Sequence, residues 1–302
     1  MMRRKWLAVI AVVLGLTVIP GLYRAAHATT GLVAQSTLSL APGVINTDYL
    51  DTDPTNVIHV VRISAGARIV IKAVPASPTG QGGTAPVMSL CQRANAVACV
   101  NGDFFDHSGA PLGGELVDAT WLRPPTASQQ QLWLDVGNQF SIGAEPAHAV
   151  QSLGATNYAI LRPGQPVAIP EHDAFADGPH ARTLVGWNAA GDRFLVTVEQ
   201  GGGSAGMSLS QAAGLMQRLG ATTAINEDGG GSSQMVAGGT LRHAPGYEGR
   251  AVANIWAVVA LPPPAPASPP PPPPRIAARR GASPGIGRLL NGLLKPARHS
   301  RP

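Results

Sequence analysis

Cysteine is scarce in this chain of 302 residues, which contains only Cys91 and Cys99. Two cysteines cannot by themselves form a structural zinc site, because such sites use four nitrogen or sulfur ligands. In an oxidising compartment an even pair predicts a disulfide, which here would join a helix to the strand that follows it. The alternative is a pair of buried free thiols.

Several nucleotide- and metal-binding motifs are also missing. No Gly-Lys-Ser or Gly-Lys-Thr occurs in the chain, which excludes a P-loop. The glycine fingerprint of dinucleotide-binding folds is absent from a strand-to-helix setting, and no segment has the ligand spacing of an EF-hand. Binding of nucleotides or calcium through these three motifs is therefore not expected.

Acidic residues are absent from both ends of the chain. The segment 275–302 carries seven Arg and Lys residues and no acid, whereas in 29–261 the 17 acids outnumber 11 basic residues. The formal net charge of +5 thus combines a basic tail with a body of about −6. A body of this charge argues against nucleic acid as a partner.

The N-terminus has the pattern of a signal peptide over residues 1–28. Three basic residues at 3–5 precede an apolar run at 6–19, and Ala-His-Ala at 26–28 fits a small-x-small cleavage site. The alternative is an uncleaved anchor, although the apolar run is short for a membrane span. The sequence therefore predicts a secreted or extracytoplasmic, envelope-associated protein.

The C-terminal region has the composition of a linker and a tail. Residues 262–274 are almost entirely proline, which predicts an extended polyproline linker. The basic tail at 275–302 is expected to be disordered and solvated, with contact to an anionic wall or membrane surface as the functional alternative.

Residues 29–261 predict one α/β (α+β) domain, with a mixed β-sheet core flanked by helices. A helix is expected at 208–219, because its apolar residues have helical spacing, Ser208 and Gln211 form a capping box, and Gly220 ends it. A second helix begins near Pro86, and 29–56 is a lead-in with one short strand. Hairpins are predicted for 56–63 with 67–74 and for 181–188 with 192–200. Further strands are expected at 97–100, 131–136, 158–162, 222–226 and 250–260.

Three polar loops follow strand ends, at 101–107, 199–206 and 226–233. Two are rich in glycine, and consecutive glycines can turn backbone N–H groups toward an anion such as phosphate; the N-terminus of the helix at 208 would add to such a site. Each loop also carries carboxylates, which suit glycosidic chemistry, where one carboxyl group moves a proton and another orients water or stabilises the sugar cation. Together these features indicate a substrate with both a sugar and a phosphate.

These loops supply the candidate site. Asp228 is the predicted acid/base, with Glu199 or Asp103 as its partner, and Arg182 is the predicted phosphate ligand. Asn101 and Asn226 would bond sugar hydroxyls or position the carboxylates. The remaining candidates for substrate binding are Ser204, Glu227, Gly229, Gly230, Gly231 and Ser232. No cofactor is indicated, but the oxygen ligands of 101–106 and 227–228 leave a Ca²⁺ or Mg²⁺ site open.

At these residues the sequence resembles the phosphodiester glycosidase family. "NAVACVNGDFF" (95–105), "ARTLVGWN" (181–188), "GGGSAGMSLSQAAGLMQRLGATTAINEDGGGSSQMV" (201–236) and "RAVANIWAVV" (250–259) are similar to four family segments in family order. The resemblance implies an extracytoplasmic hydrolase that cleaves sugar-1-phosphodiesters and releases free sugar. It carries roles onto Asn101, Arg182, Thr183, Asn226, Asp228, Gly229, Gly230 and Ser232.

Two positions depart from the family pattern. Asp103 stands where glycine is usual, and Glu227 where an apolar residue is commoner. An added acid beside the pocket would alter substrate choice or repel the phosphate. The rival hypothesis is a non-catalytic envelope protein that binds anionic glycopolymer through its basic tail.

Overall fold

The computed structural model describes residues 31–127, 129–156, 159–163, 165–167, 169, 173–243 and 249–264. The predicted signal peptide, the basic tail and all but the first residues of the proline linker lie outside this range. Within it, no helix is long and apolar enough to cross a membrane. The described chain up to Pro262 belongs to one compact unit.

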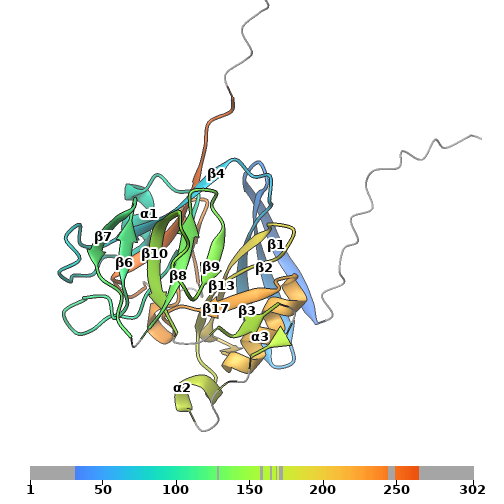
Figure 1. Ribbon diagram of the computed structural model, residues 1–302. Coiled ribbons are helices and arrows are strands. Elements are labelled where there is room, and N and C mark those ends of the chain that lie inside the picture. The colour runs from blue at the N-terminus through green and yellow to red at the C-terminus, as the bar shows by residue number, and fades with distance from the viewer. Residues whose placement is uncertain are drawn as a thin grey trace, which may run out of the picture. The chain divides into compact units, whose positions relative to one another are not determined.

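An eight-stranded sheet is the largest element (Figure 1). Its neighbouring strands pair in antiparallel fashion. The strands, in spatial order, are β1 (Leu32–Ala41), β2 (Val44–Thr52), β3 (Thr55–Ile63), β14 (Arg193–Val198), β13 (Arg182–Trp187), β17 (Thr223–Asn226), β11 (Leu161–Arg162) and β12 (Gln165–Pro166).

Two five-stranded sheets and one short hairpin complete the strands of the described residues. One sheet contains β19 (Thr240–Arg242), β18 (Met235–Ala237), β5 (Ala98–Asn101), β20 (Asn254–Ala260) and β4 (Ile69–Pro75). The other contains β7 (Thr120–Arg123), β6 (Glu115–Val117), β10 (Ala149–Ala155), β8 (Gln130–Asp135) and β9 (Phe140–Ile142). The hairpin is β15 (Gln200–Gly201) with β16 (Ser204–Ala205).

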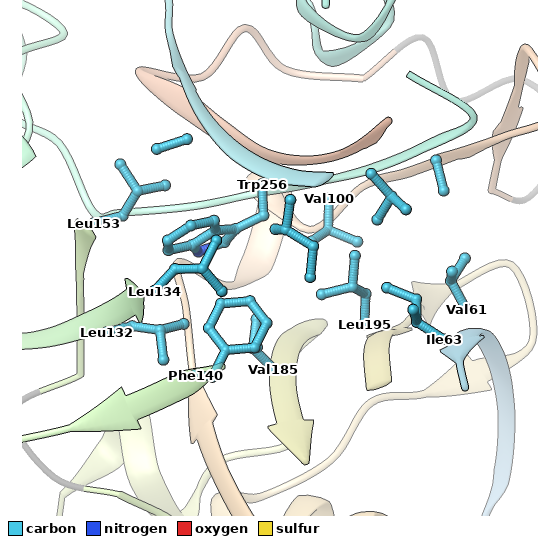
Figure 2. Close-up of a cluster of buried hydrophobic side chains, with 14 of the residues drawn as sticks. Val61, Ile63, Val100, Leu132, Leu134, Phe140, Leu153, Val185, Leu195 and Trp256 are labelled. Atoms are coloured by element: carbon cyan, nitrogen blue, oxygen red, sulfur yellow. The ribbon is translucent and has the colours of Figure 1, made fainter. Parts of the chain in front are cut away.

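All three sheets contribute to one buried core (Figure 2). Val185 and Leu195 come from the eight-stranded sheet, Leu134 from β8, and Trp256 from β20. The ring of Phe140 meets Trp256 edge to face, with centroids 5.4 Å apart. Alternate residues of each strand supply this core, so the outer faces of two sheets are left to be covered by helices.

The helices cover those outer faces and lie on opposite sides of the molecule in Figure 1. α3 (Leu209–Leu219) packs Leu215 and Met216 against Leu184 and Val196 of the eight-stranded sheet. α1 (Val87–Arg93) packs against β5 and β20. The short α2 (Ala174–Asp177) is capped by the Asp173 carboxylate, and a 3-10 turn, η1, spans Gly230–Ser232.

Much of the predicted organisation is confirmed. The chain is a single α+β domain, and α3 has the predicted capping box between Ser208 and Gln211. Gly220 ends this helix in the left-handed region, with a φ of 95°. β13 and β14 form the predicted hairpin, and Cys91 is bonded to Cys99, which joins α1 to β5. Neighbouring strands of the sheets pair in antiparallel fashion, whereas the sequence analysis predicted a mixed sheet.

Two predictions about strand pairing are wrong. β3 and β4 do not pair with each other, because the chain crosses from one sheet to the next after Ile63 and β4 pairs with β20. Both strands turn apolar residues, such as Ile63 and Ile71, into the same core from different sheets. In addition, 29–56 is not a lead-in with one short strand, because β1 and β2 form a long hairpin.

Candidate active site

Strand ends from two sheets meet at the candidate site. The backbone N–H of Asp228, after β17, donates to the carbonyl of Gly102, after β5, over 3.0 Å. The N–H of Glu227 donates to the carbonyl of Thr183 in β13 over 2.8 Å. A Cβ on Gly102 would lie 2.5 Å from Oδ1 of Asn254, so only glycine allows this close approach. Two of the three predicted loops, 101–107 and 226–233, are thus brought together.

The side chain of Asn101 is buried at this junction and forms hydrogen bonds with three other segments of the chain. Its Nδ2 donates to the carbonyl of Asp228 over 2.8 Å. Its Oδ1 accepts from Oγ1 of Thr183 at 2.6 Å and from the N–H of Gln234 at 3.1 Å. Of the two predicted roles for Asn101, the geometry favours positioning the loops, and Thr183 shares that role.

Asp103 and Glu227 form a buried acidic pair behind Asp228. Oδ2 of Asp103 accepts from the N–H of Gly113 at 2.8 Å, and Oε1 of Glu227 accepts from Nε1 of Trp256 at 2.9 Å. Burial raises the pKa of both carboxyl groups well above the usual range, and each is raised further by the charge of Asp228. Burial therefore favours the protonated form of both residues that depart from the family pattern.

Asp228 is more accessible than this pair and keeps a more moderate pKa. Burial raises the pKa of its carboxyl group to about 6, while hydrogen bonds from Ser232 and the Gly229 N–H and the charge of Arg250 lower it. Its Oδ1 accepts from Gly229 at 2.9 Å. A half-buried carboxylate that titrates near neutral pH is suited to proton transfer.

Glu115 extends the acidic cluster and was not among the predicted residues. Asn254 donates its Nδ2 to Oε1 of Glu115 over 2.9 Å and accepts from the N–H of Asp103 over 2.8 Å. Burial raises the pKa of Glu115 to about 7, against the lowering effects of Asn254 and Arg123.

Glu199 belongs to a separate network at the end of β14. Its Oε1 lies 2.7 Å from Nε2 of His59, whose Nδ1 lies 2.8 Å from Asp48. Burial lowers the pKa of His59, but its hydrogen bonds to Asp48 and Glu199 outweigh this and raise it. Glu199 is thus held by a histidine that sequence analysis missed. Ser204 donates to the Glu199 carbonyl and fixes the turn of the β15–β16 hairpin.

Arg182 is completely buried beside α2. Its guanidinium donates to the carbonyls of Met207, Phe175 and Gly178 over 2.6 to 3.0 Å, and lies 4.7 Å from the centroid of the Phe175 ring. These contacts hold α2 against β13. The binding of phosphate by Arg182 stays a prediction.

The glycine-rich loops make internal hydrogen bonds. The N–H of Gly229 donates to the Asp228 carboxylate and that of Gly230 to the Ala181 carbonyl. A Cβ on Gly229 would lie 2.9 Å from that same carbonyl oxygen, so the residue permits a close crossing of two chains. Gly231 is exposed in the η1 turn, Ser232 contacts Asp228, and Asn226 donates to the neighbouring carbonyl of Glu227.

The N-terminus of α3 likewise bonds within the protein. The N–H groups of Gly206, Met207 and Ser208 donate to Asn56, His180 and Gln211. The predicted anion site at this helix start is therefore already filled by protein acceptors.

A pocket of about 640 Å³ is lined in part by Phe105, Asp106 and His107 of the predicted loop 101–107, whereas its other lining residues were not predicted. Arg250 lines it and is exposed, with its guanidinium carbon 4.7 Å from the centroid of the Phe105 ring. The sequence predicts Arg250 at the start of the strand 250–260 and gives it no role in the site. Only its proximity to Asp228 and Phe105 in space indicates a role in the site.

No group of three or more His, Cys, Asp or Glu is arranged to hold a metal ion in the part of the chain that the structure describes. The Ca²⁺ or Mg²⁺ site that the sequence left open stays a prediction.

Comparison with known proteins relates this arrangement to one family. A family model described as phosphodiester glycosidase matches residues 94–259. A search of curated proteins gave no match. The residues matched by the family model, 94–259, contain the site-forming strands β5, β13 and β17 and the loops that follow or precede them.

Two solved structures have a similar fold. A hypothetical protein from Synechocystis is 16% identical, with a TM-score of 0.66 over 76% of this chain and 64% of that chain. This chain thus spans slightly less than two thirds of that protein. The catalytic domain of zebrafish N-acetylglucosamine-1-phosphodiester alpha-N-acetylglucosaminidase, auto-inhibited by its pro-peptide, is 20% identical, with a TM-score of 0.62 over 76% of this chain and 89% of that chain.

Proposed function

Because the chain belongs to the phosphodiester glycosidase family, we propose that it hydrolyses the bond between the anomeric carbon of a sugar and a phosphodiester oxygen, and releases the free sugar. The observation that carries this proposal is the pKa of Asp228 together with its electrostatic interaction with an arginine that lines a pocket. Its carboxyl group has a pKa of about 6, and Arg250, whose charge lowers that pKa, lines a pocket of about 640 Å³, a size typical of small-molecule sites.

Asp228 acts as a general base in this proposal. With a pKa of about 6 it is ionised at neutral pH, so it accepts the proton of a water molecule as the water oxygen bonds to the anomeric carbon. The bond from that carbon to the phosphate oxygen breaks, and the electron pair stays on the oxygen. The leaving phosphate monoester has a second pKa of about 6, so it departs as an anion without an added proton.

The acids Asp103 and Glu227 are too deeply buried to contact the substrate in this proposal. Asp103 and Glu227 are both at most 1% exposed. Burial raises the pKa of both carboxyl groups and so favours their neutral form, which does not repel a phosphodiester. The ionised Asp228 in front of them stabilises the positive charge that develops on the sugar ring.

The predicted location and partners extend this proposal. The signal pattern of residues 1–28 supports export, and the disulfide between Cys91 and Cys99 is compatible with an oxidising compartment. A sugar-phosphodiester of an envelope glycopolymer is the proposed physiological substrate. The seven basic residues of 275–302 support contact of the tail with an anionic wall or membrane surface.

The test is release of reducing sugar from a panel of sugar-1-phosphodiesters that includes a nucleotide-sugar. We expect turnover by wild type, and a loss of at least about 100-fold in kcat for Asp228→Asn, the scale of a lost proton-transfer group. Glu145→Gln, an exposed carboxyl group, is the matched control and should keep full activity.

Two further measurements distinguish this proposal from a metal-assisted hydrolase and from a non-catalytic binding protein. Loss of activity in EDTA, restored by calcium or magnesium, would assign the reaction to a metal-assisted enzyme. No sugar release by either protein, with salt-sensitive binding of anionic glycopolymer by both, would replace the hydrolase with a binding protein.

A further inference from the structure

The pocket that Arg250 lines has about equal polar and apolar surface. It is bounded by segments from three parts of the chain, which are far apart in sequence. The lining residues are Gly83, Thr84, Phe105, Asp106, His107, Ser108, Gly109, Leu112, Arg250 and Ala251. Hydroxyl, imidazole, carboxylate and backbone groups supply the polar half of the lining, and Phe105, Leu112 and Ala251 contribute to the apolar half.

Arg250 is held in place at the wall of this pocket. Its guanidinium carbon lies 4.7 Å from the centroid of the Phe105 ring, an arrangement that fixes the orientation of an exposed arginine. Its carbonyl accepts from Nε2 of Gln234 over 2.7 Å, and the Gln234 N–H donates to Asn101. Gln234 thus links the backbone of Arg250 to Asn101, which in turn bonds the backbone of Asp228.

The guanidinium acts on Asp228 from this position. Its positive charge is one of the influences that lower the pKa of the Asp228 carboxyl group. The other candidate anion ligands are engaged with the protein: Arg182 is buried against backbone carbonyls, and the Gly229 and Gly230 N–H groups have acceptors.

We propose that Arg250, stacked on Phe105, binds the phosphate of the substrate, and that the pocket holds the alcohol part of the phosphodiester. This assignment rests on the proposed function and adds to it the leaving-group side of the site. Bidentate binding of phosphate oxygens is the contact for which the guanidinium geometry is suited. The hydroxyl, imidazole and carboxylate groups of the lining can bond the hydroxyl groups of a polyol or sugar alcohol, which a long alkyl chain lacks.

The charge of the lining favours a diester over a monoester. Asp106 lies in the wall, and its Oδ1 accepts from the Ser108 N–H, the Ser108 hydroxyl and the Ala110 N–H. Asp106 and the ionised Asp228 outnumber the single arginine, so they repel the more highly charged monoester product more strongly than the singly charged diester. Hydrolysis thus weakens binding of the leaving group and promotes its release.

The test compares Arg250→Gln and Phe105→Leu with wild type, with Arg68→Gln as a control at an exposed arginine at the start of β4. The probes are the glycerol and octyl diesters of N-acetylglucosamine 1-phosphate. For the glycerol diester we expect Arg250→Gln to raise KM at least tenfold and to shift the acid limb of the pH profile upward. Phe105→Leu should have a smaller effect in the same direction, Arg68→Gln none, and the octyl diester should be the poorer substrate of wild type.

Calorimetric binding of the glycerol diester to Asp228→Asn, with and without Arg250→Gln, distinguishes the two proposals. Turnover by wild type with an unchanged KM for Arg250→Gln, or a preference for the octyl diester, would overturn the subsite and leave the function standing. Absence of turnover with Arg250-dependent binding would overturn the hydrolase and support the subsite. Absence of both turnover and binding would overturn both.

Discussion

Asn101 donates its side-chain amide to the backbone carbonyl of Asp228 over 2.8 Å, and so joins the end of β5 to the loop after β17. These two strands belong to different sheets, and Asn101 also accepts from Thr183 of β13. The orientation of the proposed base thus depends on a residue that itself touches no substrate.

Replacement of Asn101 by alanine is expected to reduce both stability and activity. It leaves the Thr183 hydroxyl, the Gln234 N–H and the Asp228 carbonyl without their partner, for a loss of about 3 kcal/mol in the free energy of unfolding. We also expect kcat to fall at least about 100-fold, because the carboxylate of Asp228 is displaced. Urea denaturation and turnover measure the two effects.

Asn138→Ala is the matched control for that variant. Asn138 bonds the backbone of Ile69 and Ile71 at a position outside the site, so its loss should destabilise the protein with kcat unchanged. A fall in kcat for Asn138→Ala equal to that for Asn101→Ala would show that activity follows stability alone.

The pH profile of turnover should rise through the pKa of Asp228. Because the base must be ionised, kcat/KM is expected to increase with pH around an apparent pKa of about 6. Ser232→Ala removes a hydrogen bond that lowers this pKa, so its profile should shift to higher pH. Ser208→Ala, at the cap of α3, should leave the midpoint in place, and a midpoint that Ser232→Ala does not move would contradict the assignment.

Glu115→Gln should stabilise the protein at high pH relative to low pH. Burial raises the pKa of Glu115 from 4.5 to about 7, so the folded state binds the proton more tightly than the unfolded state. The stability tied to this proton is present below pH 4.5 and is lost as the pH rises through about 7. A glutamine can still accept from Asn254 but does not ionise.

The expected size of that effect follows from the pKa. Each pKa unit corresponds to about 1.4 kcal/mol, so the free energy of unfolding of Glu115→Gln minus that of wild type should increase by about 3 kcal/mol between pH 4 and pH 9. Urea denaturation at several pH values measures it. A difference that is constant with pH would show that Glu115 titrates normally.

Removal of the disulfide should destabilise the domain. The two cysteines are eight residues apart, and closure of a loop of this size corresponds to about 2.5 kcal/mol. The double variant Cys91→Ala with Cys99→Ala is therefore expected to unfold at lower urea concentration. Wild type in reductant should approach the stability of the double variant, and the variant itself should not respond to reductant. A wild type equally stable with and without reductant would contradict the prediction.

The predictable part of the fold is the part encoded locally. α3 carries its own apolar spacing, cap and terminal glycine, and β13 and β14 are adjacent in sequence and in the sheet. The hairpin of β1 and β2 was predicted only as one short strand, because most side chains of β1 are exposed and its residues alternate between polar and apolar only at 37–40. The partner of β4 was missed because β20 lies about 180 residues farther along the chain.

The same distinction applies to the site. Asp228, Asp103, Glu227 and Asn101 were found because they lie in two short loops whose composition is unusual. His59 and Glu115 were missed because each meets its partner, Glu199 or Asn254, across about 140 residues of sequence. No local pattern marks such a contact.

The hydrogen bond from Trp256 to Glu227 supplies the domain with an internal optical probe. The indole of Trp256 is completely buried and donates to the carboxyl group of Glu227 over 2.9 Å. A change in the charge of that carboxyl group alters the electric field across the indole and shifts the wavelength of its fluorescence. The protonation of Glu227 as the pH changes can therefore be followed in the unlabelled protein by the fluorescence of Trp256.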